Sequence, residues 1–473
     1  MSSSAPSAAD SVSEQSVKVQ SNGALRTYIL NRPSKLNTLT EPMLDSIRRN
    51  AEEWSQSDLC GTIVGTGEGR AFCAGGDVAS VISDMADPST RPNAVRFFKT
   101  EFETDYILAT LQKPYVVILD GFTMGGGVGL SAFAPFRIAT ENTQFAMPET
   151  KIGYSPDVGG TYLLSRMDGE LGTYLGLTSD VLRGRAVFEH GFATHYIPSR
   201  RIPVLLEQLA AMENPQPFAI DRVIEELSSE RQPDEPAAPF VGKKRAALDW
   251  AFRHNQVKEI VQDLKSLRDH KDESIRQWAE STLATLEMRS PTSLKVALKA
   301  IRKGRNLTLL EALDMELKIA TAYCNGASTD FSTGVTAVLL EKVKGRPQWS
   351  PSTLDEVSPE IISRFFSSES TFLASAPKLS IPEHLNSGTP SRFMKYALPT
   401  EKEIGSVVRG EHRSGGTTGI RLDELLSRFE DLRQGKMGVK EKILEVAQRK
   451  CQIVDNADNH FVWLKWNHQA VRP

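Results

Sequence analysis

PYVVILDGFTMGGGVGL, residues 114–130, carries the clearest structural signal in the chain. Residues 114–119 form a short apolar run rich in β-branched residues, which is typical of a buried strand. The glycines of residues 125–129 follow and lead into LSAF, so we expect a turn without side chains that opens into a helix. Free N–H groups and the helix dipole favour an anion at such a place.

A second segment repeats this plan. Residues 62–66 (TIVGT) read as a strand, and GEGRAFCAGGD follows at residues 67–77. Neither glycine cluster fits the dinucleotide pattern G-x-G-x-x-G, because the third glycine falls at Leu130 or at Phe72. Two separate backbone donors aimed at one point suit a transient oxyanion instead, such as a thioester carbonyl that gains charge. The glycines could equally serve tight turns that need a positive φ.

Strands and helices alternate through the first half of the chain. Residues 26–30 predict a further strand, residues 40–54 predict a helix with Thr40 as cap and Pro42 in its first turn, and residues 95–111 predict another helix. This order indicates βα units with crossover connections and a largely parallel sheet.

From about residue 203 the pattern becomes helical. Six helices are predicted, at residues 219–227, 244–250, 256–267, 274–286, 293–301 and 309–323. Strand signals nearly vanish. Residues 350–400, rich in Ser and Pro, indicate a partly irregular connector, and residues 421–429 and 438–449 predict helices in a final appendage.

Composition excludes several classes of protein. The chain has 473 residues, 40 % of them hydrophobic, which excludes wholesale disorder, and no apolar run is long enough to span a membrane. The formal net charge of -3 gives no global nucleic-acid signature. Residues 371–473 are basic, with 16 Lys and Arg against 12 Asp and Glu. They form either a surface for an anionic partner or a solvated tail.

The termini and cysteines bear on the compartment. Residues 1–17 lack Arg and contain Asp10 and Glu14, so they match neither a transit peptide nor a secretory signal. Either the protein is cytosolic or a targeting segment is missing. The four cysteines form no CxxC pair, which favours a reducing compartment.

Two carboxylates stand out in FAMPETKIGYSPDVGG, residues 145–160. Glu149 and Asp157 sit among apolar residues, glycines and prolines, where a raised pKa would let either act as base, acid or nucleophile. Alternatively, Asp157 is a loop acid that caps a helix starting near Gly159. The eight histidines form no metal-binding pattern, and a G-x-S-x-G elbow is absent, so we expect no metal and no serine hydrolase.

Taken together, these segments resemble the crotonase (enoyl-CoA hydratase/isomerase) superfamily, and within it the 3-hydroxyisobutyryl-CoA hydrolases. The likeness covers roughly residues 20–365 and rests on six strings: LNRPSKLN (30–37), AFCAGGD (71–77), MGGGVGL (124–130), FAMPET (145–150), PDVGG (156–160) and GFATHY (191–196).

The resemblance implies an α/β fold, a crotonase-like spiral of ββα units with an α-helical C-terminal part. Along the chain it suggests a disordered tail (1–16), a catalytic core (17–215), a helical part that covers the site (216–368) and a basic, partly helical extension (369–473).

The resemblance also implies the site residues. An acyl-CoA substrate would place its adenosine end near Lys35, Leu36 and Ala74. Its carbonyl oxygen would lie in an oxyanion hole formed by the N–H groups of Gly76 and Gly126. The matching acids are Glu149 as the catalytic glutamate, Asp157 as the aspartate that marks the hydrolases, and Glu101 in the substrate pocket. No cofactor is implied beyond the CoA of the substrate.

One position separates hydrolysis from hydration. Hydratases of the superfamily resemble GGGxE at the second glycine turn, whereas this chain has Gly129 there and carries its second acid at Asp157. We therefore expect hydrolysis of 3-hydroxyisobutyryl-CoA to 3-hydroxyisobutyrate and CoA, a step of valine catabolism, with hydration or isomerisation as the alternative. Tyr154 and Ser155 depart from the family's IGLFPDVGG and predict a more polar pocket wall.

The extension implies a second hypothesis. Some fungal relatives occur as a mitochondrial ribosome component, so the extension could meet RNA or protein on a ribosome, and the chain could be a structural subunit. The family resemblance implies a mitochondrial location, with no membrane partner.

Overall fold

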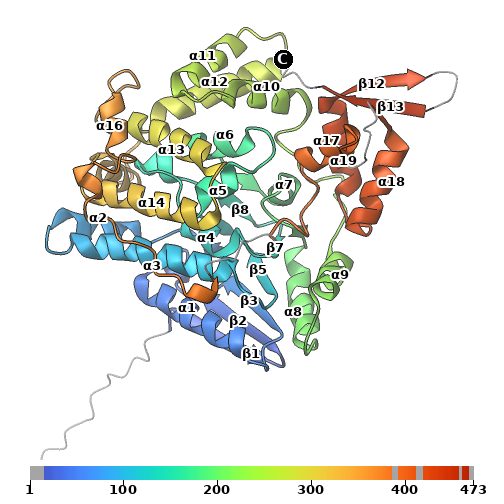
Figure 1. Ribbon diagram of the computed structural model, residues 1–473, viewed down its shortest axis with the longest axis horizontal. Helices are drawn as coiled ribbons and strands as arrows, with labels where there is room; N and C mark the ends of the chain where they lie inside the picture. The colour runs from blue at the N-terminus through green and yellow to red at the C-terminus, as the bar shows by residue number, and fades with distance from the viewer. Residues whose placement is uncertain (1–14, 386–392, 412–418, 457–460, 468–473) are drawn as a thin grey trace, which may run out of the picture.

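The computed structural model describes residues 15–385, 393–411, 419–456 and 461–467, and two β-sheets form its centre (Figure 1). The larger sheet has six strands, in the order β1 (Val17–Asn22), β2 (Leu25–Leu30), β3 (Thr62–Gly67), β5 (Tyr115–Leu119), β7 (Phe136–Ala139) and β10 (His195–Tyr196). Only β1 and β2 pair antiparallel in it, so the predicted parallel sheet is confirmed. Residues 1–14 of the expected N-terminal tail lie outside the described residues.

The smaller sheet contains the second strand of each ββα unit. Its order is β4 (Ala71–Cys73), β6 (Phe122–Met124), β8 (Gln144–Ala146) and β9 (Leu182–Arg183). The pairs β3/β4, β5/β6 and β7/β8 are split between the sheets and each is followed by helix, which is the expected ββα spiral. The helical elements of this part are η1 (Pro33–Lys35), α1 (Glu41–Gln56), α2 (Val78–Ala86), α3 (Arg91–Ala109), α4 (Gly126–Ser131), η2 (Glu149–Ile152), α5 (Gly160–Leu164), α6 (Leu171–Thr178), α7 (Arg185–Glu189) and η3 (Ser199–Arg201).

The larger sheet is covered on both faces. Val64 and Ile118 point to one face and pack against α8 (Ile202–Ala210) and α9 (Pro217–Leu227). Ile63, next to Val64, belongs to the main core with α1 and α3, because successive side chains of a strand point to opposite faces. This double burial explains why the strands read as continuous apolar runs.

The first helix differs from its prediction in one detail. Thr40 is at the N-cap of α1 and Pro42 is in its first turn, as expected, but the Thr40 side chain accepts no hydrogen bond. The helix therefore depends on its apolar face, which buries Met43, Leu44 and Ile47 in the core.

The helical C-terminal part lies over the elements that carry the predicted site residues. Its members are α10 (Gly242–Phe252), α11 (Val257–Leu267), α12 (Glu273–Met288), α13 (Pro291–Gly304), α14 (Leu309–Cys324), α15 (Asp330–Val335), η4 (Thr336–Leu340) and α16 (Pro359–Ser363). Helix α14 packs on α3, and α13 packs on α5 and α6 (Figure 1).

The extension is a small α/β unit. After η5 (Thr371–Leu373) and η6 (Glu383–Leu385) it comprises α17 (Glu401–Val408), β11 (Ile420–Arg421), α18 (Leu422–Arg433), α19 (Val439–Lys450), β12 (Cys451–Asn456) and β13 (Phe461–Trp466). The two predicted helices appear as α18 and α19. The antiparallel sheet β11–β13–β12 contradicts the expectation that strands vanish from this half.

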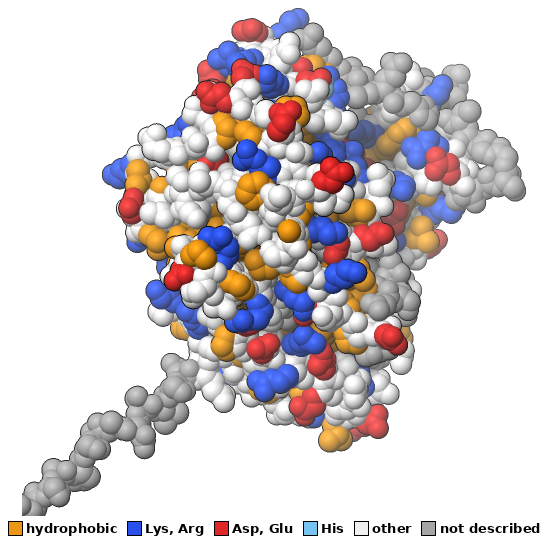
Figure 2. All heavy atoms as spheres, turned by 60° about the vertical axis from the view of Figure 1, so that its left-hand side comes forward, with side chains coloured by type: hydrophobic (Ala, Val, Ile, Leu, Met, Phe, Trp, Pro, Cys, Tyr) orange, Lys and Arg blue, Asp and Glu red, His pale blue; other side chains and the backbone are white. Residues whose placement is uncertain are grey.

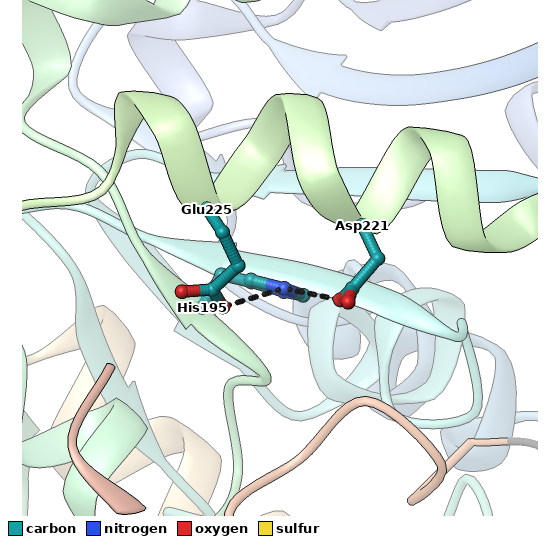
Figure 3. A group of neighbouring side chains, drawn as sticks. All are labelled: His195, Asp221 and Glu225. Atoms are coloured by element: carbon teal, nitrogen blue, oxygen red, sulfur yellow. Dashed lines mark hydrogen bonds and ion pairs between the residues drawn. The ribbon is translucent and has the colours of Figure 1, made fainter. Parts of the chain in front are cut away.

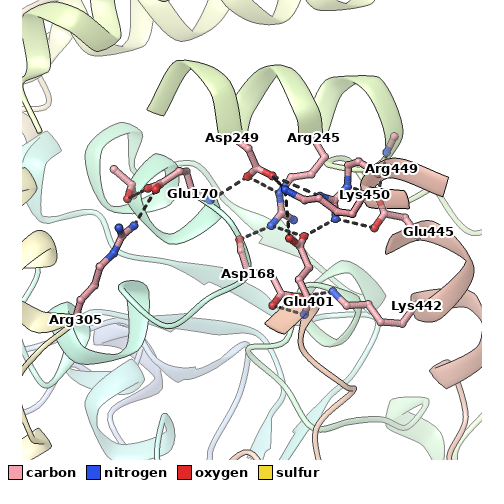
Figure 4. A network of polar contacts seen from close by, with 12 residues as sticks. Asp168, Glu170, Arg245, Asp249, Arg305, Glu401, Lys442, Glu445, Arg449 and Lys450 are labelled. Carbon is pink, nitrogen blue, oxygen red and sulfur yellow. Dashed lines mark hydrogen bonds and ion pairs between the residues drawn. The ribbon is translucent and has the colours of Figure 1, made fainter. Parts of the chain in front are cut away.

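A buried ionic network joins the extension to the helical part (Figure 4). Arg449 of α19 pairs with Glu401 of α17 and lies 3.5 Å from Asp249 of α10, while Arg245 of α10 lies 3.2 Å from Glu401. Burial alone would raise the pKa of Glu401, but Arg245 and Arg449 hold it well below its usual range. Arg449 of the extension is therefore paired inside the molecule, which contradicts a simple solvated tail.

The extension also reaches the core. Lys442 pairs with Asp168 at 2.6 Å. Arg137 is fully buried, and its guanidinium donates to the carbonyl oxygens of Phe192 and Ala134 and, at 2.7 Å, of Phe393. Burial lowers the pKa of Arg137 to about 9. The extension therefore helps to satisfy a buried charge of the core.

The surface is mixed in character. On the face drawn in Figure 2, acidic and basic side chains are interspersed with hydrophobic ones. Among the described residues, no helix has both the length and the apolar character needed to cross a membrane.

Candidate active site

The two glycine turns meet in the folded chain. Gly76 follows β4 and Gly126 begins α4, and the Gly76 nitrogen lies 3.3 Å from the position that a Cβ on Gly126 would take. Gly125 has φ +47°, which favours a glycine there. The Leu39 N–H donates to Gly75 O at 2.8 Å and fixes the first turn. Within the described residues, neither the Gly76 nor the Gly126 amide donates to a carbonyl, so both are available to an anion.

Two buried glutamates flank this pair of amides. Glu149 opens η2 directly after β8, and its Oε1 lies 3.2 Å from the Cβ position of Gly125. Glu101 projects from α3, with Oε1 against the Cβ position of Gly126 and 3.7 Å from that of Gly76. Each has one buried oxygen without a hydrogen-bond partner, Oε2 of Glu149 and Oε1 of Glu101. The structure thus brings four of the predicted residues together.

Asp157 joins the same electrostatic cluster from the loop before α5. It is buried, and the Tyr154 hydroxyl lies beside its carboxyl group without completing a hydrogen bond. Asp157 does not cap α5: Gly159 is at the N-cap, and no side chain of the loop accepts a bond there. The sequence-based alternative of a capping role is therefore wrong, and the Asp157 side chain stays with the other acids.

Burial and mutual repulsion raise the pKa values of these acids. Burial raises the pKa of Glu101 and of Glu149 to about 8, with the neighbouring Glu149 adding to the effect on Glu101. Burial also raises the pKa of Asp157 well above its usual range, and the charges of Glu149 and Glu101 raise it further. Perturbed carboxyl groups around free backbone donors are typical of an active site.

Sequence reasoning missed Asp105, a further acid on α3. Both of its oxygens are buried without a partner, and burial raises its pKa well above the usual range, with further contributions from Glu101 and Asp157. Its Oδ2 lies 2.5 Å from the Cβ position of Gly129. The spacing of four residues between Glu101 and Asp105 on one predicted helix could have found it.

Glu316, on α14, was also missed. Its carboxylate accepts hydrogen bonds from the N–H groups of Gly159 and Thr161, at 2.7 and 2.9 Å, at the N-cap and in the first turn of α5. Burial raises the pKa of Glu316 to about 7 in spite of these bonds. No local sequence signal points to it, because 155 residues separate it from Thr161.

An aromatic wall lies beside the acids. The Tyr154 ring stacks on Phe331 and Phe98, with centroids 4.6 and 5.5 Å apart, and lies 5.0 Å from Tyr323. The hydroxyl groups of Tyr154 and Ser155 are both buried without a partner. The wall therefore combines aromatic rings with two unsatisfied hydroxyl groups, in line with the expected polar character.

The residues expected near the adenosine end lie next to the first glycine turn. The Ala74 N–H donates to Leu36 O at 3.0 Å, and Lys35 is exposed beside them. Leu36 has φ +51°, in the left-handed region that residues other than glycine rarely adopt. Leu36 and Ala74 are half-buried, and Ala74 stands two residues before Gly76 in the same turn.

One other cluster has the composition of a metal site. Ligand atoms of His195 on β10 and of Asp221 and Glu225 on α9 lie within 4.8 Å of one another (Figure 3). His195 Nε2 is 2.9 Å from Asp221 Oδ1. The Lys436 ammonium group of the extension already contacts Glu225, so an internal cation is paired with one of these two carboxylates.

The chain is similar to a known protein family and to named relatives in it. Residues 25–366 match the family described as Enoyl-CoA hydratase/isomerase. The chain is 37 % identical over 456 residues to the small ribosomal subunit protein mS47 of Neurospora crassa, covering 93 % of this chain and 86 % of that protein. It is 38 % identical over 355 residues to the mitochondrial 3-hydroxyisobutyryl-CoA hydrolase of Homo sapiens, covering 75 % of this chain and 89 % of that enzyme.

Solved structures agree on the fold. A carnitinyl-CoA dehydratase from Mycobacterium thermoresistibile superposes with a TM-score of 0.68 at 31 % identity, covering 78 % of this chain and 100 % of that one. An enoyl-CoA hydratase from Rhodobacter sphaeroides gives a TM-score of 0.65 at 29 % identity, covering 75 % and 97 %.

Proposed function

Because this chain belongs to the enoyl-CoA hydratase/isomerase family, we propose that it hydrolyses an acyl-CoA thioester, with 3-hydroxyisobutyryl-CoA as its substrate. The observation that carries the proposal is the convergence of the Gly76 and Gly126 amides beside Glu149 and Glu101, with Asp157 in the same cluster. The hydrolase relatives, of which one is named above, support the choice of substrate. CoA enters as part of the substrate, past Lys35, Leu36 and Ala74, and no further cofactor is needed.

The two amides would stabilise the oxyanion of the thioester carbonyl. A donor of this kind typically lowers the barrier by about 3 kcal/mol. Glu149 either takes a proton from water or attacks the carbonyl carbon itself to form an anhydride. In both routes oxygen bonds to the carbonyl carbon, the C–S bond breaks, and the CoA thiolate takes up a proton that comes from water. In the anhydride route water then hydrolyses the anhydride, which releases the carboxylic acid product and regenerates Glu149. Asp157 orients the water or the substrate hydroxyl group.

Hydration of a double bond fits the site less well. The resemblance places the second hydratase acid at position 129, where this chain has glycine. A Cβ there would lie 2.5 Å from Asp105 Oδ2 and 2.6 Å from the Val158 Cβ, distances too short for a side chain. The acids that remain, Glu149 and Asp157, suit attack at the thioester carbon.

Release of free thiol from 3-hydroxyisobutyryl-CoA tests the proposal. The full chain should release CoA, Glu149→Gln should lose activity by about 10²-fold or more, and Glu141→Gln should keep it. Glu141 is a suitable control because it bonds Ser199 at the surface. A Glu149→Gln variant with full activity would end the proposal. Single turnover in ¹⁸O-labelled water tests the anhydride route, since label that appears in Glu149 itself requires the anhydride.

A second role, in a ribosome, is supported by how much of the chain one relative matches. The ribosomal relative matches 93 % of this chain, whereas the human hydrolase matches 75 %. We therefore also propose that the chain can assemble with a small ribosomal subunit of mitochondria through its extension, with or without thioesterase activity. Co-sedimentation of the full chain with mitochondrial ribosomes supports this role, and recovery only in the free fraction contradicts it.

A further inference from the structure

Glu316 reaches from the helical C-terminal part to the loop that carries Asp157. It is 1 % exposed, and its carboxylate accepts three hydrogen bonds. The donors are the Gly159 N–H at 2.7 Å, the Thr161 N–H at 2.9 Å and the Thr161 hydroxyl at 2.5 Å. These groups lie at the start of α5, where the first N–H groups have no partner within the helix.

Asp157 is the residue that would otherwise take this position. Aspartate side chains commonly bond the backbone N–H two residues further along, and for Asp157 that group belongs to Gly159. Glu316 already holds that N–H. The main-chain oxygen of Asp157 accepts from the Gly160 N–H at 2.6 Å, so the loop keeps its tight turn without the Asp157 side chain.

The backbone of the loop requires external support. Val158 has φ +54°, a region that β-branched residues rarely adopt, and Gly159 follows with φ +78°. A strained conformation persists only where its surroundings hold it, and such conformations gather at functional sites. The hydrogen bonds that the Glu316 carboxyl group accepts supply that hold directly after the strained residue.

We propose that Glu316 is a positioning residue, which caps α5 in place of Asp157 and thereby leaves the Asp157 carboxyl group to the acyl-CoA site. This inference rests on the proposed hydrolase function and adds a role for the helical part in it. Loss of Glu316 frees the Gly159 N–H, and Asp157 then turns back to bond it. The site loses one of its acids although the fold remains.

Kinetics of three variants of the full chain test this role. With 3-hydroxyisobutyryl-CoA, Glu316→Gln should lower kcat by about 10²-fold, the effect typical of a misplaced reacting group, with little change in KM. Thr161→Val removes one of the three bonds and should give a smaller loss. Glu311→Gln is the control, because Glu311 lies on the same helix but bonds only the capping residue Thr308. Full kcat in Glu316→Gln, or an equal loss in Glu311→Gln, overturns the proposal.

A crystal structure of Glu316→Ala gives a readout that does not depend on activity. The Asp157 carboxylate should then lie within hydrogen-bond distance of the Gly159 nitrogen. An Asp157 side chain that stays among Glu101 and Glu149 contradicts the proposal. The structure of Glu316→Gln serves the same purpose if the alanine variant does not fold. A wild-type chain that hydrolyses no acyl-CoA ends the hydrolase function, while the position of Asp157 still decides the role of Glu316.

Discussion

The Asp105 carboxyl group occupies the space beside Gly129, with Oδ2 2.5 Å and Cγ 2.8 Å from the position of a Cβ on that glycine. The acid comes from α3, whereas Gly129 belongs to α4. A carboxyl group from one element therefore fills the volume in which a side chain on the other would begin. Asp105 also lies in the cluster of Glu101 and Asp157, and both of its oxygens lack partners.

This contact predicts a coupling between the two positions. Gly129→Ala alone should lower the free energy of unfolding by about 1–3 kcal/mol, because the added Cβ overpacks a filled site. Combining it with Asp105→Ala should restore part of that loss, and the Val158 Cβ at 2.6 Å should prevent full restoration. Denaturant titration of the two single variants and the double variant measures the coupling. Strictly additive losses would contradict the contact.

The buried acids predict an unusual dependence of stability on pH. The pKa of Glu101 and of Glu149 is about 8 in the folded chain and that of Glu316 is about 7, against an ordinary value of 4.5. The folded state thus holds more protons than the unfolded state between about pH 4.5 and pH 8, so the free energy of unfolding should fall as pH rises through this window. Melting temperatures measured from pH 5 to pH 8 test this, and Glu101→Gln should flatten the slope. If Glu101→Gln leaves the slope of melting temperature against pH unchanged, Glu101 does not contribute to that pH dependence.

The hydroxyl group of Tyr154 predicts a contrast between two neighbouring tyrosines. Tyr154→Phe removes a buried hydroxyl without a partner and should raise the free energy of unfolding by about 1 kcal/mol. Tyr323→Phe is the matched control: its hydroxyl lies 3.3 Å from Ser293 Oγ, so its loss should lower stability by about the same amount. If the Tyr154 hydroxyl binds the substrate, Tyr154→Phe should raise KM for 3-hydroxyisobutyryl-CoA but not for isobutyryl-CoA. Equal effects on both thioesters would exclude that contact.

The ionic network predicts which residues hold the extension in place. Arg449→Ala leaves the buried Glu401 and Asp249 with fewer cations, and disruption of such a buried pair typically costs about 3–5 kcal/mol. Hydrogen exchange of α17 should then become faster. Lys440→Ala, at an exposed position on α19, the helix that carries Arg449, should leave the hydrogen exchange of α17 unchanged. Equal protection in both variants would show that apolar packing alone docks the extension.

Local patterns in the sequence predicted those features that depend on residues close together in the chain. The glycine turns at Gly76 and Gly126 could be found because each lies in a glycine-rich segment that comes after a strand. Glu149 and Asp157 could be found because acids between apolar residues and prolines are unusual. That the turns meet, with the Gly76 nitrogen 3.3 Å from the Cβ position of Gly126, depends on how the two sheets pack. The resemblance supplied that relation where periodicity could not.

Long-range partners could not be predicted in this way. Glu316 reads as one more acid on an amphipathic helix, and only the folded chain shows that it bonds a loop 155 residues away. Lys436 reads as part of a basic extension, yet its ammonium group is buried against Glu225. The strand β12 was missed because it mixes polar and apolar residues next to the stronger signal of α19. The strand β13 (FVWLKW) is rich in aromatic and β-branched residues, a pattern typical of a strand that the sequence-based prediction overlooked.

A crystal structure of the full chain with a non-hydrolysable analogue of 3-hydroxyisobutyryl-CoA tests the central claim most directly. The distances from the acyl carbonyl oxygen to the Gly76 and Gly126 nitrogens are the quantities to measure. We predict that both are about 3 Å, with Glu149 and Asp157 facing the carbonyl carbon. An acyl carbonyl bound away from either amide, or acids turned from it, would contradict the proposed hydrolysis.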